Sequence, residues 1–115
     1  MGGNAQASMS GAHLLEYCGS SDGAFEGICL GYINGYLDLN NLIQDPRVYP
    51  WKEGDKNKIP KTCLPTHVTV GQIRTVLLAY PLRFRPEPRD QLLKFNGGIL
   101  LSRSIRAAWP CEKNN

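Results

Sequence analysis

Apolar side chains recur at three- and four-residue steps in four stretches of the chain, which is the spacing of amphipathic α-helices. These stretches are 10–18, 23–43, 70–80 and 91–109. No stretch alternates apolar and polar residues as a half-buried strand does. The pattern therefore predicts an all-α, four-helix domain with a long loop between the second and third helices. We expect a single domain over residues 1–115, with flexible ends at 1–9 and 112–115.

The third predicted helix has the clearest start in the chain. Thr69 and Gln72 have the spacing of a capping box, in which each side chain accepts from the other residue's backbone N–H. Val68 and Ile73 are placed to form a hydrophobic staple around this cap. Pro81 is expected to end the helix, because the residue before a proline is disfavoured in helical conformation.

Two connectors flank this helix. Residues 44–62 are rich in proline and lysine, and a loop of this length is often functional. Residues 81–90 are proline-rich and basic, and are expected to form a rigid link to the fourth helix. Asp90 is the expected cap of that helix, and Gly97-Gly98 is its expected weak point.

A glycine stripe runs along the second predicted helix at four-residue spacing, formed by Gly27, Gly31 and Gly35. Each glycine disfavours a helix by about 1 kcal/mol relative to alanine, so three on one face suggest close approach of another backbone. That backbone belongs either to a helix of the same chain or to a second copy in a dimer. A membrane helix is disfavoured by the interrupting polar residues Glu26, Asn34 and Asp38.

Charge is divided unevenly along the chain, although the formal total is only +3. Residues 1–46 contain five acids and no Lys or Arg, which gives −5, whereas residues 47–115 carry +8. The acids that balance the basic half disfavour nucleic acid as the ligand. A solvated basic face, or a patch for an acidic protein partner, is favoured.

The four cysteines favour disulfides in an oxidising compartment over free thiols. None forms a C-x-x-C pair, and His13 and His67 lie at no zinc-like spacing from them, so a metal site is disfavoured. Four cysteines allow three pairings. An up-and-down bundle brings the start of the third helix near the end of the fourth, which favours Cys63–Cys111 and Cys18–Cys29 over the other two.

Motifs for catalysis are absent from the sequence, including the nucleophile elbow, the P-loop, H-E-x-x-H and the dinucleotide fingerprint. A Cys–His enzyme is disfavoured because all four cysteines are better used in disulfides. We therefore expect a protein that is not an enzyme and has no cofactor. The start of the chain lacks a basic and an apolar signal region, and we expect that an export signal has been removed.

Four short motifs together resemble the Tai/Rap family of type VI secretion immunity proteins, which neutralise peptidoglycan amidase effectors. The motifs occur in the order G-I-C-L-G-Y at 27–32, C-L-P at 63–65, V-T-V-G-Q at 68–72 and A-A-W-P-C at 107–111. The resemblance covers about residues 12–111. It implies a periplasmic, all-helical, disulfide-bonded and often dimeric protein that blocks the effector's active-site cleft. Cys29, Cys63 and Cys111 match the family's cysteines, and Cys18 resembles its cysteine in the first helix.

Partner choice is expected to lie in the two connectors, where this chain departs from the family. Pro81 follows Tyr80 where the family usually continues Leu-Arg, and the 44–62 loop is unusually rich in Lys and proline. The predicted partner-binding residues are Tyr49, Trp51, Arg83, Phe84 and Arg85. The alternative is that Trp51 and Phe84 simply cover the ends of the bundle. The alternative function is that of a periplasmic chaperone or adaptor.

Overall fold

The fold is built from α-helices, which confirms the predicted all-α class. The computed structural model describes residues 9–48, 50, 52, 54 and 62–111, and this part of the chain contains no β-strand. The helices are α1 (Gly11–Cys18), α2 (Gly23–Gln44), α3 (Val70–Ala79), α4 (Pro86–Lys94) and α5 (Gly97–Ala108), with a short 3-10 helix η1 (Tyr80–Arg83) after α3. Within the same residues, no helix combines the length and apolar character needed to cross a membrane.

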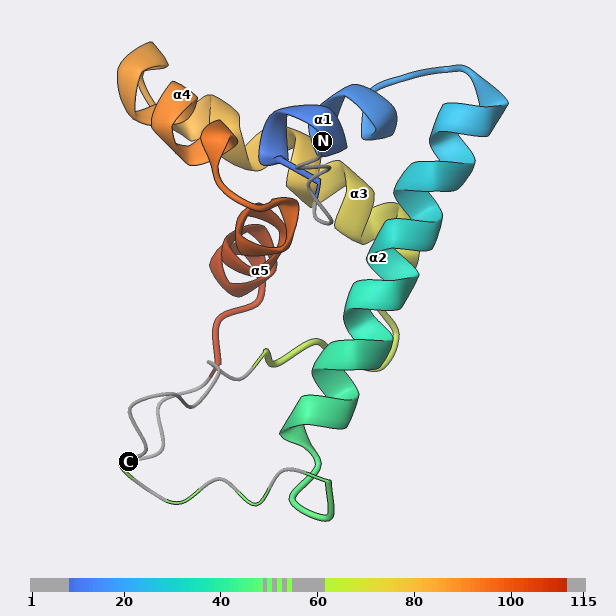
Figure 1. Cartoon of the computed structure of the whole chain (residues 1–115), viewed down its shortest axis with the longest axis vertical. Helices are drawn as coiled ribbons and strands as arrows, with labels where there is room; N and C mark the ends of the chain where they lie inside the picture. The colour runs from blue at the N-terminus through green and yellow to red at the C-terminus, as the bar shows by residue number, and fades with distance from the viewer. Residues whose placement is uncertain (1–8, 49, 51, 53, 55–61, 112–115) are drawn as a thin grey trace, which may run out of the picture.

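The core lies where α1, α3 and α5 meet the N-terminal half of α2 (Figure 1). The C-terminal part of α2 extends beyond the other helices toward the lower end of the view, and α4 lies at the upper end. Ten apolar side chains are buried and form the core: Leu14, Cys18, Cys29, Ile33, Ile73, Leu77, Leu92, Leu100, Leu101 and Ile105. The core therefore leaves much of α2 with one face unpacked.

The start of α3 is as the sequence predicts. The Thr69 hydroxyl accepts from the Gln72 backbone N–H at 3.1 Å, and the Thr69 N–H donates to the Gln72 side-chain oxygen at 2.8 Å. This is a complete capping box. It satisfies backbone groups at the helix start that would otherwise lack partners.

The predicted fourth helix over 91–109 is wrong, because the chain forms two helices there. Helix α4 begins at Pro86, inside the expected connector 81–90, and Pro81 lies within η1. Proline is favourable at the first helical position, where its fixed φ suits the helix and its missing N–H has no partner to lose. The chain then breaks at Phe95, and Asn96 caps α5 by accepting from the Gly98 N–H at 2.6 Å. The domain thus has five α-helices in its described residues.

The break between α4 and α5 pairs with the first residue of α1 and with Met9 just before that helix. The Gly11 N–H donates to the Phe95 carbonyl at 2.8 Å, and the Gly97 N–H donates to the Met9 carbonyl at 2.6 Å. Met9, the one described residue of the predicted flexible end 1–9, is half-buried against the core. Residues 1–8 and 112–115, the rest of the predicted flexible ends, lie outside the described residues.

Gly97 is expected to be intolerant of a side chain, whereas Gly31 is expected to tolerate one. A Cβ on Gly97 would lie 3.1 Å from the Tyr32 hydroxyl, 3.2 Å from Leu14 and 3.2 Å from the Met9 carbonyl oxygen. We expect Gly97→Ala to lower the free energy of unfolding by about 1–3 kcal/mol, as overpacking does. A Cβ on Gly31 meets no described atom within 4 Å, so Gly31→Ala should raise the free energy of unfolding by up to about 1 kcal/mol through helix propensity. Urea denaturation checks both, and equal stability of Gly97→Ala and the unsubstituted protein would contradict the close packing.

Candidate functional site

Two disulfides hold the helices together, and their pairing is the one that the topology favours. Cys18–Cys29 joins the end of α1 to α2, with Cα atoms 4.9 Å apart. Cys63–Cys111 joins the segment before α3 to the segment after α5, with Cα atoms 5.2 Å apart. All four cysteines are thereby used. Among the residues that the structure describes, no group of three or more His, Cys, Asp or Glu side chains is placed to hold a metal ion.

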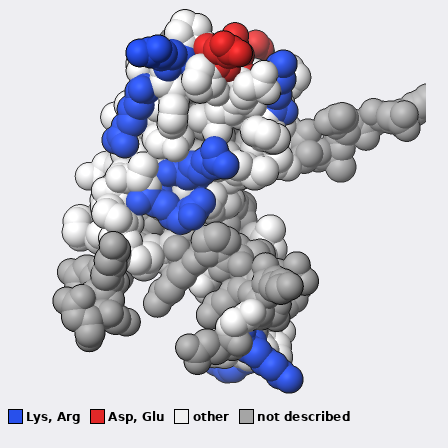
Figure 2. Space-filling view, turned by 90° about the vertical axis from the view of Figure 1, so that its left-hand side faces the viewer, with Lys and Arg blue, Asp and Glu red and all other residues white. Residues whose placement is uncertain are grey.

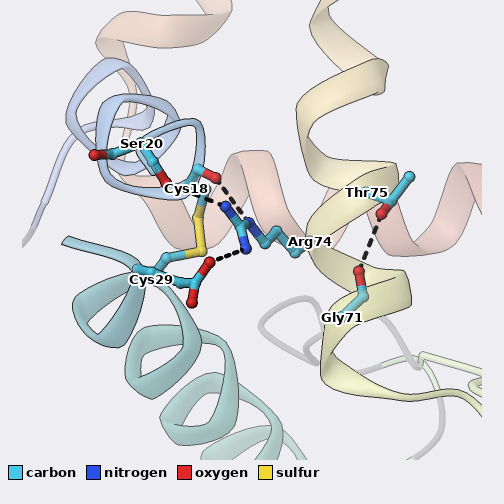
Figure 3. Close-up of a disulfide and its surroundings, with 7 residues drawn as sticks. Cys18, Ser20, Cys29, Gly71, Arg74 and Thr75 are labelled. Atoms are coloured by element: carbon cyan, nitrogen blue, oxygen red, sulfur yellow. Dashed lines mark hydrogen bonds and ion pairs between the residues drawn. A yellow bond between two sulfur atoms is a disulfide. The ribbon is translucent and has the colours of Figure 1, made fainter. Parts of the chain in front are cut away.

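Arg74 on α3 connects three segments beside the first disulfide (Figure 3). Its Nε donates to the Cys18 carbonyl at 2.8 Å, and one terminal nitrogen donates to the Ser20 carbonyl at 3.3 Å. The other terminal nitrogen pairs with the Glu26 carboxylate at 2.8 Å. One guanidinium therefore holds the end of α1, the following turn and the start of α2. Helical periodicity does not reveal such a role, because it says nothing of which carbonyls lie across the interface.

The structure does not bring the predicted partner-binding residues together in its described part. Tyr49 and Trp51 lie outside the described residues. The loop start at 45–48 follows the far end of α2, whereas η1 and the start of α4 lie at the opposite end of the molecule (Figure 1). Arg83 and Arg85 are exposed at that second end, where Arg83 stacks over the Tyr80 ring at 5.6 Å.

Phe84 is half-buried and packs against the core. Its ring meets the Tyr80 ring edge-on at 5.3 Å, and its carbonyl accepts from Arg89 at 2.7 Å. Arg89 also donates to the Pro81 carbonyl at 3.1 Å, which ties α4 to η1. These contacts suit a side chain that covers one end of the bundle, the alternative that the sequence leaves open for Phe84.

The glycine stripe does not pack against another described helix of this chain. Gly27, Gly31 and Gly35 are exposed, and a Cβ built on any of them meets no described atom within 4 Å. The interpretation as intrachain helix packing is therefore wrong for the described residues. The core draws on another face of α2, which buries Cys29 and Ile33. The dimer interface stays a prediction.

A groove lies between α2 and α5, with a volume of about 660 Å³. We call it the α2–α5 groove. Its lining includes Gly31, Gly35 and Leu39 from α2, and Gly98, Ile99 and Arg106 from α5. Leu39 is 56% exposed and Ile99 is 43% exposed, so the groove presents apolar surface to water. The sequence analysis missed this site, although the glycine stripe marks one of its walls.

The surface of the α2–α5 groove is mostly apolar, although six of its lining residues carry polar groups: Tyr32, Tyr36, Asn40, Asn96, Ser102 and Arg106. Tyr32 lies on its inner side, and burial raises the pKa of its hydroxyl above the usual value, so this group is neutral near pH 7. No Asp or Glu lines the groove, and Arg106 is its one charged lining residue. Arg106 is exposed and has no hydrogen bond or ion pair to a described residue.

The basic half of the chain forms a basic face on the structure. Figure 2 shows Lys and Arg side chains spread over the side of the molecule on which α4 and α5 lie, with acidic side chains gathered at one end. The exposed basic residues of η1, α4 and α5, with Arg85 between them, are Arg83, Arg85, Lys94, Arg103 and Arg106. This arrangement agrees with the charge division along the sequence. It makes a negatively charged partner surface favourable.

Helical packing stabilised by two disulfides, with a groove open to water between α2 and α5, defines a small disulfide-bonded all-α domain. A comparison with protein-family models matches residues 10–111 to the family described as Rap1a immunity proteins, and the chain belongs to this family. Comparisons with curated proteins and with solved structures gave no match. Family membership indicates an immunity function against a secreted effector, and immunity proteins are generally not enzymes.

Proposed function

We propose that this protein is a periplasmic immunity protein that binds a type VI secreted peptidoglycan amidase and inhibits it by occluding the active-site cleft. The family match over residues 10–111 carries the proposal, since it spans every described helix and both disulfides. The resemblance of the ordered motifs to the Tai/Rap proteins supports an amidase as the effector. The two disulfides support an oxidising compartment such as the periplasm.

The turn around η1 is one surface that we propose for contact with the amidase. Arg83 and Arg85 are exposed there, at the end of the molecule that also carries α4 (Figure 1). Phe84 lies between them and is fixed by its packing on Tyr80, which holds the two arginines on a rigid turn. Rigid placement reduces the entropy lost on binding. Tyr49 and Trp51 are proposed to contribute from the other connector.

Calorimetric titration tests the proposed function. We expect one purified, catalytically inactivated amidase from a panel to bind with a nanomolar Kd, and a reduced, carboxymethylated unfolded protein not to bind. Micromolar binding to unfolded proteins with no amidase bound would instead support a periplasmic chaperone or adaptor. Alanine at Tyr49, Trp51, Arg83, Phe84 and Arg85 should weaken amidase binding. Undiminished binding with unchanged melting would reject the contact role of the connectors.

A further inference from the structure

We infer that the α2–α5 groove is a docking site for a segment of the effector that presents a large apolar side chain beside a carboxylate. The inference rests on the proposed function, because it takes the effector as the partner. The groove would be a second contact surface for the effector, besides the two connectors. The effector segment enters a groove on this protein, in addition to any part of this protein that enters the effector's cleft.

The shape and lining of the groove suit an apolar side chain. Gly31 and Gly35 on α2 line the groove together with Gly98 and Ile99 on α5, and the space beside Gly31 and Gly35 is open because a Cβ on either would meet no described atom within 4 Å. A volume of about 660 Å³ lies within the usual range of pockets that enclose an organic ligand. Leu39 and Ile99 would lose contact with water on binding, which favours association.

The charge of the groove specifies an acidic neighbour for that side chain. Arg106 reaches the groove without a described partner, and no carboxylate lines the groove to neutralise it. A guanidinium pairs with a carboxylate through two parallel hydrogen bonds, which adds geometric selectivity. Arg103 lies exposed on the same helix but not in the lining, so a positive field surrounds the groove on the α5 side.

A second copy of this chain fits the groove wall less well than the effector does. Helix α2 carries the acids Glu26 and Asp38 and no Lys or Arg. Glu26 already pairs with Arg74 of its own chain at 2.8 Å, so two copies of α2 packed along the glycine stripe would leave the Asp38 carboxylates without a cation on either helix. Like charges at such distances destabilise helix pairing. The family match, by contrast, indicates an effector partner directly.

Contacts at one end of the groove connect its two walls. Asn40, a buried lining residue of α2, accepts from the Thr62 hydroxyl at 2.8 Å, one residue before the Cys63–Cys111 disulfide. That disulfide fixes the same segment to the chain just beyond α5. The two walls are therefore linked through one hydrogen bond and one disulfide. A site that exists before binding loses less entropy on association.

Two groove variants with matched controls test the inference against the amidase that the panel titration identifies. Gly35→Trp fills the groove, and Gly27→Trp places the same side chain on the same stripe outside the lining. Arg106→Glu reverses the groove charge, and Arg103→Glu makes the same change on α5 outside the lining. We expect each groove variant to raise the Kd about 100-fold, the scale of a central interface residue, and each control to change it less than about threefold. Circular dichroism should match the unsubstituted protein in all four, and the melting temperature should not fall in any of them.

The outcomes separate the inference from the proposed function. Unchanged amidase binding by both groove variants overturns the groove and leaves the proposed function standing. Failure of the unsubstituted protein to bind any amidase of the panel contradicts both. Sedimentation adds a third readout, because a dimer that Gly35→Trp converts to a monomer with unchanged amidase affinity would assign the groove to a second copy and overturn the inference.

Discussion

Replacing Cys63 and Cys111 together by serine is expected to lower the free energy of unfolding by about 4 kcal/mol through loss of the cross-link alone. The two cysteines are 48 residues apart in sequence, so their bond shortens a long loop in the unfolded chain. In the chain-entropy model the stabilisation grows with the logarithm of loop length, and the 11-residue separation of Cys18 and Cys29 gives about 3 kcal/mol. A domain of this size can lose most of its stability by such a change.

Urea denaturation of the double variant checks this expectation, with the Cys18→Ser/Cys29→Ser variant as the comparison. Cys18 and Cys29 are fully buried, so serine at these positions also buries hydroxyl groups, which lowers stability further. Serine at Cys63 and Cys111 does not have this cost, because Cys63 is half-buried and Cys111 is exposed. The Cys63–Cys111 bond closes the part of the chain that holds α3, η1, α4 and α5. A loss below about 1 kcal/mol for the Cys63/Cys111 variant would show that this bond does not constrain the chain as the chain-entropy model requires.

Arg74→Met is expected to lower the free energy of unfolding by about 2–3 kcal/mol, the second large effect. The change leaves the Cys18 and Ser20 carbonyls without the donor that they share, in a partly buried position. Breaking a hydrogen bond to a charged donor commonly has this magnitude. The ion pair with Glu26 adds little, because the Glu26 side chain is 44% exposed and water screens the attraction.

Two control variants separate the contributions of Arg74. Arg103→Met removes an exposed arginine and should alter stability by less than about 0.5 kcal/mol. Glu26→Gln removes only the charge of the ion pair and should cost less than about 1 kcal/mol. If Glu26→Gln destabilises the protein as much as Arg74→Met does, the ion pair and not the two carbonyls carries the interaction.

Local sequence signals predicted most of the fold. The apolar spacing places α1, α2 and α3 within a residue or two of their observed bounds, and Thr69 with Gln72 fixes the start of α3. The prediction failed at α4, where prolines were interpreted as a rigid connector although one of them begins a helix. It failed again at the break after Lys94, where α4 ends and the Asn96 side chain caps α5, because the apolar pattern continues across that break.

The candidate site was much harder to predict, because it depends on how distant segments pack. Gly31 and Arg106 line the same groove although 75 positions separate them in the sequence. The glycine stripe signalled a surface without side chains, but sequence alone did not show whether a helix of this chain covers it. The charge division pointed to the basic half. It did not show that an arginine of that half lies beside the glycine face of the acidic half.

Inhibition of a purified peptidoglycan amidase is the most direct test of the central claim. The active form of the amidase that binds in the panel titration would be mixed with increasing amounts of this protein, and release of peptide from purified peptidoglycan measured. The proposed function predicts that hydrolysis falls in proportion to the added protein and stops near equimolar amounts. Full hydrolysis in the presence of a large excess of bound protein would contradict the claim that this immunity protein acts by occluding the active-site cleft of an amidase.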